Sequence, residues 1–184
     1  MARDLLGVLL CRRDDGRLTI GRIVETEAYG GPEDLASHAR AGLTRRTAPM
    51  FGEMGHAYVY LVYGMHECLN VVAHDGEAAA GAVLLRAVEP LSGIDVMRER
   101  RGRAQDPDYR LASGPARLCQ AMAVTRAFDG HDLTTGDRLW LASDDRRGSA
   151  DKVAVGTRVG VDYAGEWSQR PWRFWLAGNR SVSR

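Results

Sequence analysis

The chain has 184 residues, of which 45% are hydrophobic and 27% are charged, a balance typical of a folded globular protein rather than of a disordered chain. The formal net charge is only +1, so a nucleic-acid partner would have to meet a local basic patch rather than a global positive field. The three cysteines form no CxxC pair, and the sequence has no signal peptide and no apolar run of membrane-spanning length, so we expect a cytoplasmic protein without a disulfide framework, structural zinc or membrane partner.

The first predicted elements are a hairpin and a short helix. Residues 5–11 form an apolar run that is too short to assign to a helix or a strand. An Asp-Gly pair then indicates a turn before residues 18–24, which we predict to form a strand that continues to Glu27. Residues 32–38 begin with proline and two acids, which predicts a short helix.

A three-stranded meander is predicted next, with strands over residues 58–63, 69–74 and 82–87 and turns at Gly64 and at the Asp-Gly pair 75–76. Two helices are predicted next, one over residues 92–103 and one from an N-cap at Ser113 to Val124. Three further strands are predicted at residues 139–141, 158–163 and 172–176.

The polar segment 144–152 is predicted to be a mobile loop, and no repeat or interdomain linker is seen. We therefore expect one mixed α/β (α+β) domain over residues 1–184. It would be built on a curved, largely antiparallel sheet with flanking helices and a protruding hairpin.

Two neighbouring acids are the first candidates for chemistry. Strand alternation places Glu25, Glu27 and Tyr29 on one face of their strand. The acids either face solvent, or one of them lies in a low-dielectric pocket, where a carboxylate beside a bound water can act as a general base. The sharp bend predicted at residues 30–32 favours the pocket, because functional side chains are common at such strand ends.

Aromatic residues follow on the meander. Tyr58 and Tyr60 share one face of their strand, which by itself is typical of a sheet surface or core. Tyr63 falls on the other face and precedes Gly64 at the predicted hairpin tip, where a large ring is hard to bury. It is either an exposed residue without a role or a wedge for another molecule, as in proteins that insert side chains between base steps.

Arginines supply the third group of candidates. Arg86 is flanked by apolar residues and therefore needs an anionic partner. An ion pair with Glu25, Glu27 or Glu89 is compatible with a role in fixing a catalytic carboxylate and its water. The basic segments 98–103 and 45–46 either face solvent or contact phosphates. The five histidines have no metal-ligand spacing, and no phosphate-binding glycine loop is present, so neither a metal nor a cofactor is expected.

A set of segments spread over nearly the whole chain matches one enzyme family. They are residues 24–29, 31–34, 38, 50–51, 58–60, 63–65, 70, 84–90, 113–115, 118–121, 158–161, 164–167, 171–174 and 178–179. Together they resemble the 3-methyladenine (alkyladenine) DNA glycosylase family. Agreement in order over nearly the full length is more specific than any single motif.

The resemblance implies a base-excision repair enzyme whose partner is double-stranded DNA containing damaged purines. Such an enzyme flips an alkylated or deaminated purine out of the duplex and hydrolyses its N-glycosidic bond. By the same resemblance Glu27 would activate the attacking water and Arg86 would help to hold it. No cofactor is implied.

The resemblance also implies a binding pocket. Tyr29, His38 and Tyr60 would line it and sandwich the extruded base, while Asn70 would crowd the amino group of guanine and exclude that base. Physical chemistry supports the aromatic walls, because alkylated purines such as 3-methyladenine are cationic and a desolvated cation over a ring gains roughly 1–2 kcal/mol.

On the DNA side, the resemblance implies that Tyr63 fills the gap left in the helix and that Met65 lies nearby in the minor groove. The chain also departs from the family pattern at three places. Glu67 replaces a usual aromatic residue, Thr47 an expected asparagine, and residues 116–117 (Ala-Arg) a small residue with lysine.

Lys152 is the only lysine and lies far from the proposed pocket segments, so a Schiff-base step is not expected and an abasic site should be the product. Two alternatives remain open at this stage, a non-catalytic module that binds duplex or transfer RNA and a hydrolase of free nucleosides. The predicted wedge and the basic runs favour a polymer. One compact domain on DNA is expected to act as a monomer.

Overall fold

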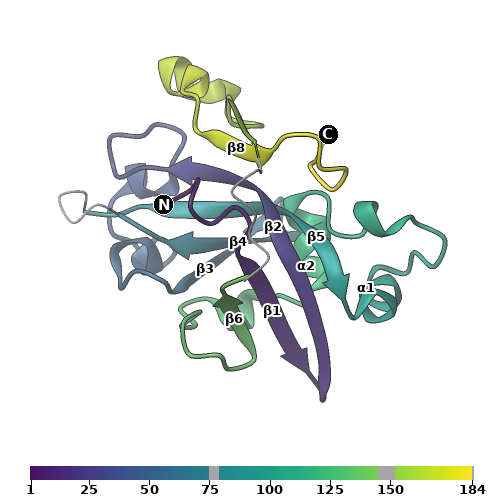
Figure 1. Cartoon of the computed structure of the whole chain (residues 1–184). Coiled ribbons are helices and arrows are strands. Elements are labelled where there is room, and N and C mark those ends of the chain that lie inside the picture. Colours follow the sequence, from purple (N-terminus) through teal and green to yellow (C-terminus); the bar gives the residue numbers. More distant parts are fainter. Residues whose placement is uncertain (75–78, 145–151, 184) are drawn as a thin grey trace.

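An antiparallel sheet organises the chain (Figure 1). The computed structural model describes residues 1–74, 79–144 and 152–183. Within these ranges eight strands form one curled sheet, in the order β3-β4-β5-β2-β1-β6, with β8 also paired to β2 and β7 paired to β8. The strands are β1 (Leu9–Asp14), β2 (Arg17–Tyr29), β3 (Ala57–Val62), β4 (His66–Val72), β5 (Ala82–Ser92), β6 (Leu139–Ala142), β7 (Val153–Gly156) and β8 (Arg173–Leu176). The predicted α+β class and antiparallel sheet are thus confirmed.

Short helices complete the described part of the chain. The two α-helices are α1 (Ile94–Arg101) and α2 (Pro115–Ala121), and Figure 1 shows them together beside β5. The 3₁₀ helices are η1 (His38–Ala41), η2 (Ala48–Phe51), η3 (Asp108–Arg110), η4 (Arg126–Phe128) and η5 (Asp162–Gln169). No helix in the ranges given above is long and apolar enough to cross a bilayer.

Strand β2 is the central element, because it has partners along both edges. One edge pairs with β5 from Ile20 to Tyr29. The other edge pairs with β1 as far as Arg22 and then with β8 from Glu25 to Glu27. The carboxyl-terminal half of β2 is therefore held by backbone hydrogen bonds on both sides, which fixes the positions of the two acids that it carries.

Two bulges interrupt the pairing of β2 with β5 at these acids. Ile23 pairs with Val88 and Glu25 with Ala87, which leaves Val24 as an extra residue on β2. Thr26 then pairs with Leu85, so Arg86 is the extra residue on β5. A β-bulge bends its strand and changes the direction of the side chain that it carries. Here it turns Arg86 toward the acids of the neighbouring strand.

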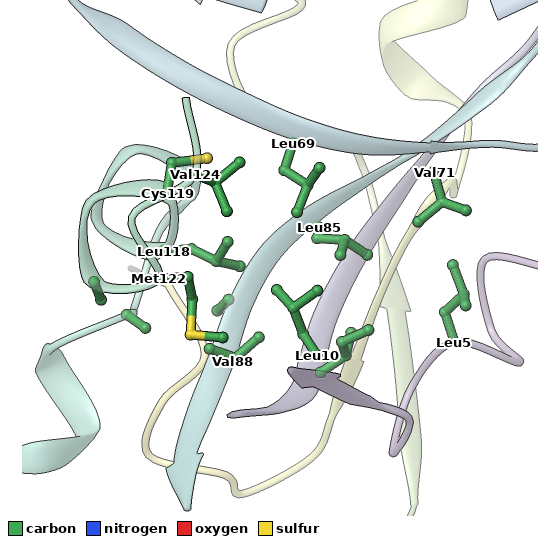
Figure 2. Close-up of a cluster of buried hydrophobic side chains, with 14 of the residues drawn as sticks. Leu5, Leu10, Leu69, Val71, Leu85, Val88, Leu118, Cys119, Met122 and Val124 are labelled. Atoms are coloured by element: carbon green, nitrogen blue, oxygen red, sulfur yellow. The ribbon is translucent and has the colours of Figure 1, made fainter. Parts of the chain in front are cut away.

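The main hydrophobic core lies between the sheet and α2. Figure 2 shows side chains of α2 and of the segment after it facing those of β4 and β5 across this core; the labelled ones include Leu118, Met122, Val124, Leu69 and Leu85. Proline at the first turn suits the start of α2, since that position needs no backbone N–H donor. A second, smaller cluster around Met50 and Tyr58 lies on the side of the hairpin.

The β3–β4 hairpin ends in a three-residue loop, residues 63–65. Tyr63 and Gly64 both adopt positive φ, 52° and 69°, and the N–H of Met65 donates to the carbonyl of Val62 at 3.1 Å. Positive φ costs glycine little, which explains Gly64 and confirms the predicted turn. The positive φ of Tyr63 also ends β3 at Val62, one residue earlier than predicted. Tyr63 is 88% exposed and Met65 is 70% exposed.

Some predicted elements are wrong, and one side chain explains two of them. Residues 32–37 form turns and a bend rather than a helix, and η1 begins only at His38. The reason is that the Asp34 carboxylate accepts hydrogen bonds from the N–H groups of Gly30 and Ala36 and pairs with Arg158. The same pairing fixes Arg158 just before a bend at residues 159–160, and η5 begins at Asp162, so the predicted strand 158–163 does not form.

Other boundaries differ less. Helix α2 begins after Gly114, not after an N-cap at Ser113, since Ser113 forms an isolated bridge with Ala87. No local pattern indicated β7, and the undecided run 5–11 contains the start of β1. The predicted turn at residues 75–76, and residues 145–151 of the predicted mobile loop, lie outside the described residues.

Candidate active site

A cavity of about 330 Å³ opens where the hairpin, β5 and the segment before η5 meet. Its walls come from regions far apart in the sequence, and aromatic rings form much of them. The lining residues include Tyr29, His38, Tyr58, Tyr60, Tyr63, Cys68, Asn70, Arg86, Val159 and Tyr163. Six of the eight residues predicted to form a site therefore contribute to one cavity.

Glu27 lies directly behind this wall and is fully buried. Its Oε1 accepts a hydrogen bond from the N–H of Val159 at 2.8 Å and lies 3.3 Å from a guanidinium nitrogen of Arg86. Its Oε2 accepts from the hydroxyl of Tyr29 at 2.9 Å. All three donors line the cavity, so the carboxylate is one hydrogen bond away from it and does not face bulk solvent.

Arg86 joins the two acids of β2. Its Nε donates to Oε1 of Glu25 at 2.9 Å while its Nη1 lies 3.3 Å from Oε1 of Glu27. Burial alone would lower the pKa of Arg86, but the negative charges of Glu27 and Glu25 outweigh burial and raise it. The guanidinium therefore stays charged. Glu89, the third partner considered from the sequence, instead lies near Arg22 and Asn179.

Tyr29 is held by a buried ion pair beneath it. Both guanidinium nitrogens Nη1 and Nη2 of Arg158 bind the two oxygens of Asp34, at 2.6 and 3.0 Å, and both side chains are fully buried. The guanidinium lies 4.9 Å from the centre of the Tyr29 ring. Burial and then the charge of Glu27 raise the pKa of Tyr29. The hydroxyl therefore keeps its proton and donates a hydrogen bond to the carboxylate.

His38 stands at the mouth of the cavity as an uncharged ring. Burial, together with the charges of Arg46 and Arg40, lowers its pKa from 6.5 to about 4. Arg46 can only donate, and its Nη2 lies 3.3 Å from Nε2 of His38, so Nε2 is the acceptor. Nδ1 therefore carries the proton and donates to the hydroxyl of Tyr58 at 2.9 Å.

This lowered pKa predicts a pH dependence of stability. The unfolded chain takes up the His38 proton near pH 6.5 and the folded chain only near pH 4, so stability should fall as the pH drops through this window. We expect His38→Gln to lose less stability than wild type between pH 7 and pH 4.5 in urea titrations. The control His66→Gln alters an exposed histidine and should behave as wild type. An unchanged pH dependence in His38→Gln would contradict the assignment.

Three of the rings that line the cavity pack against one another. His38 and Tyr60 touch edge to face, with centroids 4.5 Å apart, and Tyr58 packs against Tyr60 at 5.3 Å. A base cannot enter between these three. Among the described residues no ring contact joins Tyr29 to His38 or Tyr60, although all three rings line the cavity.

Asn70 and Cys68 close the inner side of the cavity. The side-chain amide of Asn70 is buried and donates to the carbonyl of Tyr58 at 2.9 Å, which fixes its orientation. Burial raises the pKa of the Cys68 thiol to about 11, so the thiol is protonated and serves as a small wall residue. All three cysteines are free and buried.

The surface beside the hairpin is basic. A groove from Met65 to α2 is lined by three arginines whose heads reach the surface, Arg101, Arg103 and Arg117. Not every arginine of the run 98–103 is available there, however. Arg98 is paired with Asp95 and Asp108, and Arg100 with Asp14, so these two contribute to structure rather than to a free basic face.

The structure thus brings together Glu27, Arg86, Tyr29, His38, Tyr60 and Asn70, and it places Tyr63 at the cavity edge with Met65 in the adjoining groove. Sequence reasoning assigned no role to Asp34 or Arg158, and it did not name Ser183 at all. Their partners lie more than 120 residues away, and no local pattern marks such a pair. Within the described ranges, no cluster of three or more His, Cys, Asp or Glu side chains is arranged to hold a metal ion.

Comparison with known proteins gives a consistent result. The family model described as methylpurine-DNA glycosylase (MPG) matches residues 1–180. The chain is 46% identical to the DNA-3-methyladenine glycosylase of Mus musculus and 45% identical to that of Homo sapiens, aligned over its whole length but over only 57% and 63% of those proteins. A putative 3-methyladenine DNA glycosylase of Anaeromyxobacter sp. (strain Fw109-5) is 49% identical, with 86% of its length covered.

Proposed function

Because the chain belongs to the methylpurine-DNA glycosylase family, we propose that it removes damaged purines from double-stranded DNA by hydrolysing the N-glycosidic bond. The observation that carries the proposal is the position of Glu27. This carboxylate is buried, is bound by three donors that all line one cavity, and lies behind a wall formed largely by aromatic rings.

The proposed reaction uses this carboxylate as a general base. A water bound at the inner end of the cavity attacks C1′ of the flipped nucleotide, and Glu27 accepts the proton that the water loses. The C1′–N bond breaks, and its electron pair leaves with the base. Arg86 places a guanidinium nitrogen 3.3 Å from Oε1 of Glu27 and offers donors toward the same water. A cationic purine leaves as the neutral base, whereas a neutral purine leaves as an anion that takes up a proton from solvent. The products are the free purine and an abasic site.

The electrostatics of the cavity favour purines that are cationic or poor in electrons. His38 carries no charge at pH 7, so it does not repel an alkylated purine such as 3-methyladenine. The rings of Tyr29 and Tyr60 present electron-rich faces to such a base. We place the flat base between Tyr29 and the pair of His38 and Tyr60, where neutral lesions of the hypoxanthine and ethenoadenine class would also be held by stacking. The fixed amide of Asn70 supports a role in excluding the amino group of guanine.

We further propose that the enzyme is monofunctional and acts as a single copy. Strand cleavage by a glycosylase needs an amine for a Schiff base, and no lysine lines the cavity. The only lysine, Lys152, is exposed, with its carbonyl bound to the N–H of Ala177 at the end of β8. A single copy already supplies the six predicted site residues that line the cavity.

The test uses duplex oligonucleotides that carry hypoxanthine, ethenoadenine or 3-methyladenine at one position. We expect release of the damaged base and an abasic site that breaks only after alkali treatment. Borohydride should trap no protein–DNA adduct. A protein that binds these duplexes without releasing any base would instead be a non-catalytic module. Equal rates on free inosine and on the duplex would indicate a nucleoside hydrolase.

Tyr63 is proposed to be the wedge that fills the gap left by the flipped nucleotide. Its ring is 88% exposed and borders the cavity, and stacking of a base on an aromatic ring is worth about 1–3 kcal/mol. We therefore expect Tyr63→Ala to lower single-turnover excision of hypoxanthine paired with thymine by roughly 10- to 100-fold.

Two controls separate this role from a general effect. Tyr63→Phe keeps the ring and should retain the wild-type rate. On single-stranded substrate, where no gap must be filled, Tyr63→Ala should lose little activity. Equal activity of Tyr63→Ala and wild type on the paired duplex would exclude the wedge role.

A further inference from the structure

Glu25 is buried as completely as Glu27, yet it is separated from the cavity by Arg86. We propose that Glu25, Arg173 and Ser183 are positioning residues that hold Arg86 against the general base. This inference rests on the proposed function, because it names residues that fix the position of Arg86 in the proposed active site. None of the three lines the cavity, so each would act through Arg86.

The contacts of Glu25 are saturated and specific. Its Oε1 accepts hydrogen bonds from Nε of Arg86 at 2.9 Å, from Nε of Arg173 at 2.7 Å and from the hydroxyl of Ser183 at 2.9 Å. Its Oε2 accepts from the backbone N–H of Ser183 at 2.6 Å. A fully buried carboxylate with four donors is fixed in place, and so is the guanidinium bound to it.

The charges explain why a second arginine is needed. Glu25 and Glu27 compete for Arg86, which lies between them. Arg173 supplies a second positive charge on the Glu25 side, so the four buried or half-buried groups sum to zero. Without Arg173, the Arg86 guanidinium would have to neutralise two carboxylates and would be drawn toward one of them. The arrangement therefore leaves Nη1 of Arg86 directed at Glu27.

The tail that follows β8 closes this network. The hydroxyl of Ser183 also accepts from Nη2 of Arg86 at 3.2 Å, and the carbonyl of Ser183 accepts from Nη2 of Arg173 at 3.2 Å. One residue upstream, the carbonyl of Val182 accepts from the hydroxyl of Ser113, just before α2. The tail thus bridges β2, β5 and β8, and it brings a residue 158 positions away to Glu25.

The experiment compares Ser183→Ala with Ser183→Thr and with a matched control, Ser181→Ala. Ser181 is also buried in the tail but makes none of the contacts to Glu25 or Arg86 described above. We expect Ser183→Ala to lower the single-turnover excision rate at saturating enzyme about 10-fold, in line with loss of a hydrogen bond to a charged group. Its affinity for the duplex should be unchanged. Ser183→Thr should restore the rate, and Ser181→Ala should not lower it.

A double-mutant cycle distinguishes positioning from general structural support. If Ser183 acts through Arg86 on the general base, Ser183→Ala should have no further effect in a Glu27→Gln background. An additive loss, a wild-type rate in Ser183→Ala, or failure of the threonine variant to recover activity would each overturn the proposal. Should Ser183→Ala fold poorly, Arg173→Gln tests the same network from a partly exposed position.

A second measurement does not depend on activity. The Arg86 Nε–H resonance, assigned by its loss in Arg86→Lys, should be sharp and protected in wild type and should shift or broaden in Ser183→Ala but not in Ser181→Ala. If the wild type releases no base, the proposed function fails while this spectrum still decides whether the network holds Arg86. An Arg86 resonance unaffected by Ser183→Ala would overturn the positioning role.

Discussion

Replacement of Glu27 by glutamine is expected to reduce base excision to a slow residual rate while leaving DNA binding intact. A general base contributes roughly 10²- to 10⁴-fold to the rate, and glutamine cannot accept the proton of the attacking water. Glutamine fits the site, because its oxygen can accept from the N–H of Val159 while its amide donates to the hydroxyl of Tyr29, which can turn to accept. The measurements are single-turnover release of hypoxanthine and a binding titration with the same duplex.

The control for this variant is Glu33→Gln. Glu33 is an exposed carboxylate six residues away, whose contact is to the N–H of Gly31, and its removal should leave the excision rate unchanged. Wild-type release by Glu27→Gln would refute the assignment of the general base. Loss of both binding and release would show instead that the substitution damages the fold.

The second large effect is expected from the buried pair of Asp34 and Arg158. Asp34→Asn keeps the shape of the side chain but leaves a fully buried guanidinium without its counter-charge. Breaking one partner of such a pair costs about 3–5 kcal/mol, which for a chain of this length corresponds to a fall in Tm of about 6–20 °C. The loop that presents Val159 to Glu27 should also be displaced, so excision should fall with stability.

Two comparisons sharpen this prediction. Removing the exposed pair of Arg17 and Glu99 through Glu99→Gln should cost no more than about 1 kcal/mol. The double variant Asp34→Leu with Arg158→Met replaces the buried charges by apolar groups and should recover part of the lost stability but not the activity. A change of Tm below about 2 °C in Asp34→Asn would contradict the importance of the pair.

Local patterns were sufficient for much of the sheet. Alternating apolar residues and glycine-marked turns located β2, β3, β5 and β8 to within a few residues, and Gly64 marked the hairpin tip. The periodicity of β2 also placed Glu25 and Glu27 on one face, which their shared contact with Arg86 confirms. These features depend on contacts within a strand or between neighbouring strands, so the sequence expresses them directly.

The burial of the two acids was not decided by that pattern. Periodicity allowed either exposed or buried side chains, and both acids are buried because β8 and the C-terminal tail cover β2 at this point. Likewise Asp34 looked like an acid in the first turn of a helix. Its carboxylate instead binds Arg158, 124 residues away, and this pairing removed both the predicted helix at 32–38 and the predicted strand at 158–163.

The sequence by itself therefore determined the class of fold, the long strand that carries the acids, the aromatic hairpin and, through its motifs, the family. Only the tertiary structure decided which carboxylate faces the cavity wall and what holds it there. The physical reason is that a buried charge is set by partners from distant segments, here 61 to 158 residues away. Their approach depends on strand register, on the bulge at Arg86 and on the closing tail, and local periodicity encodes none of these.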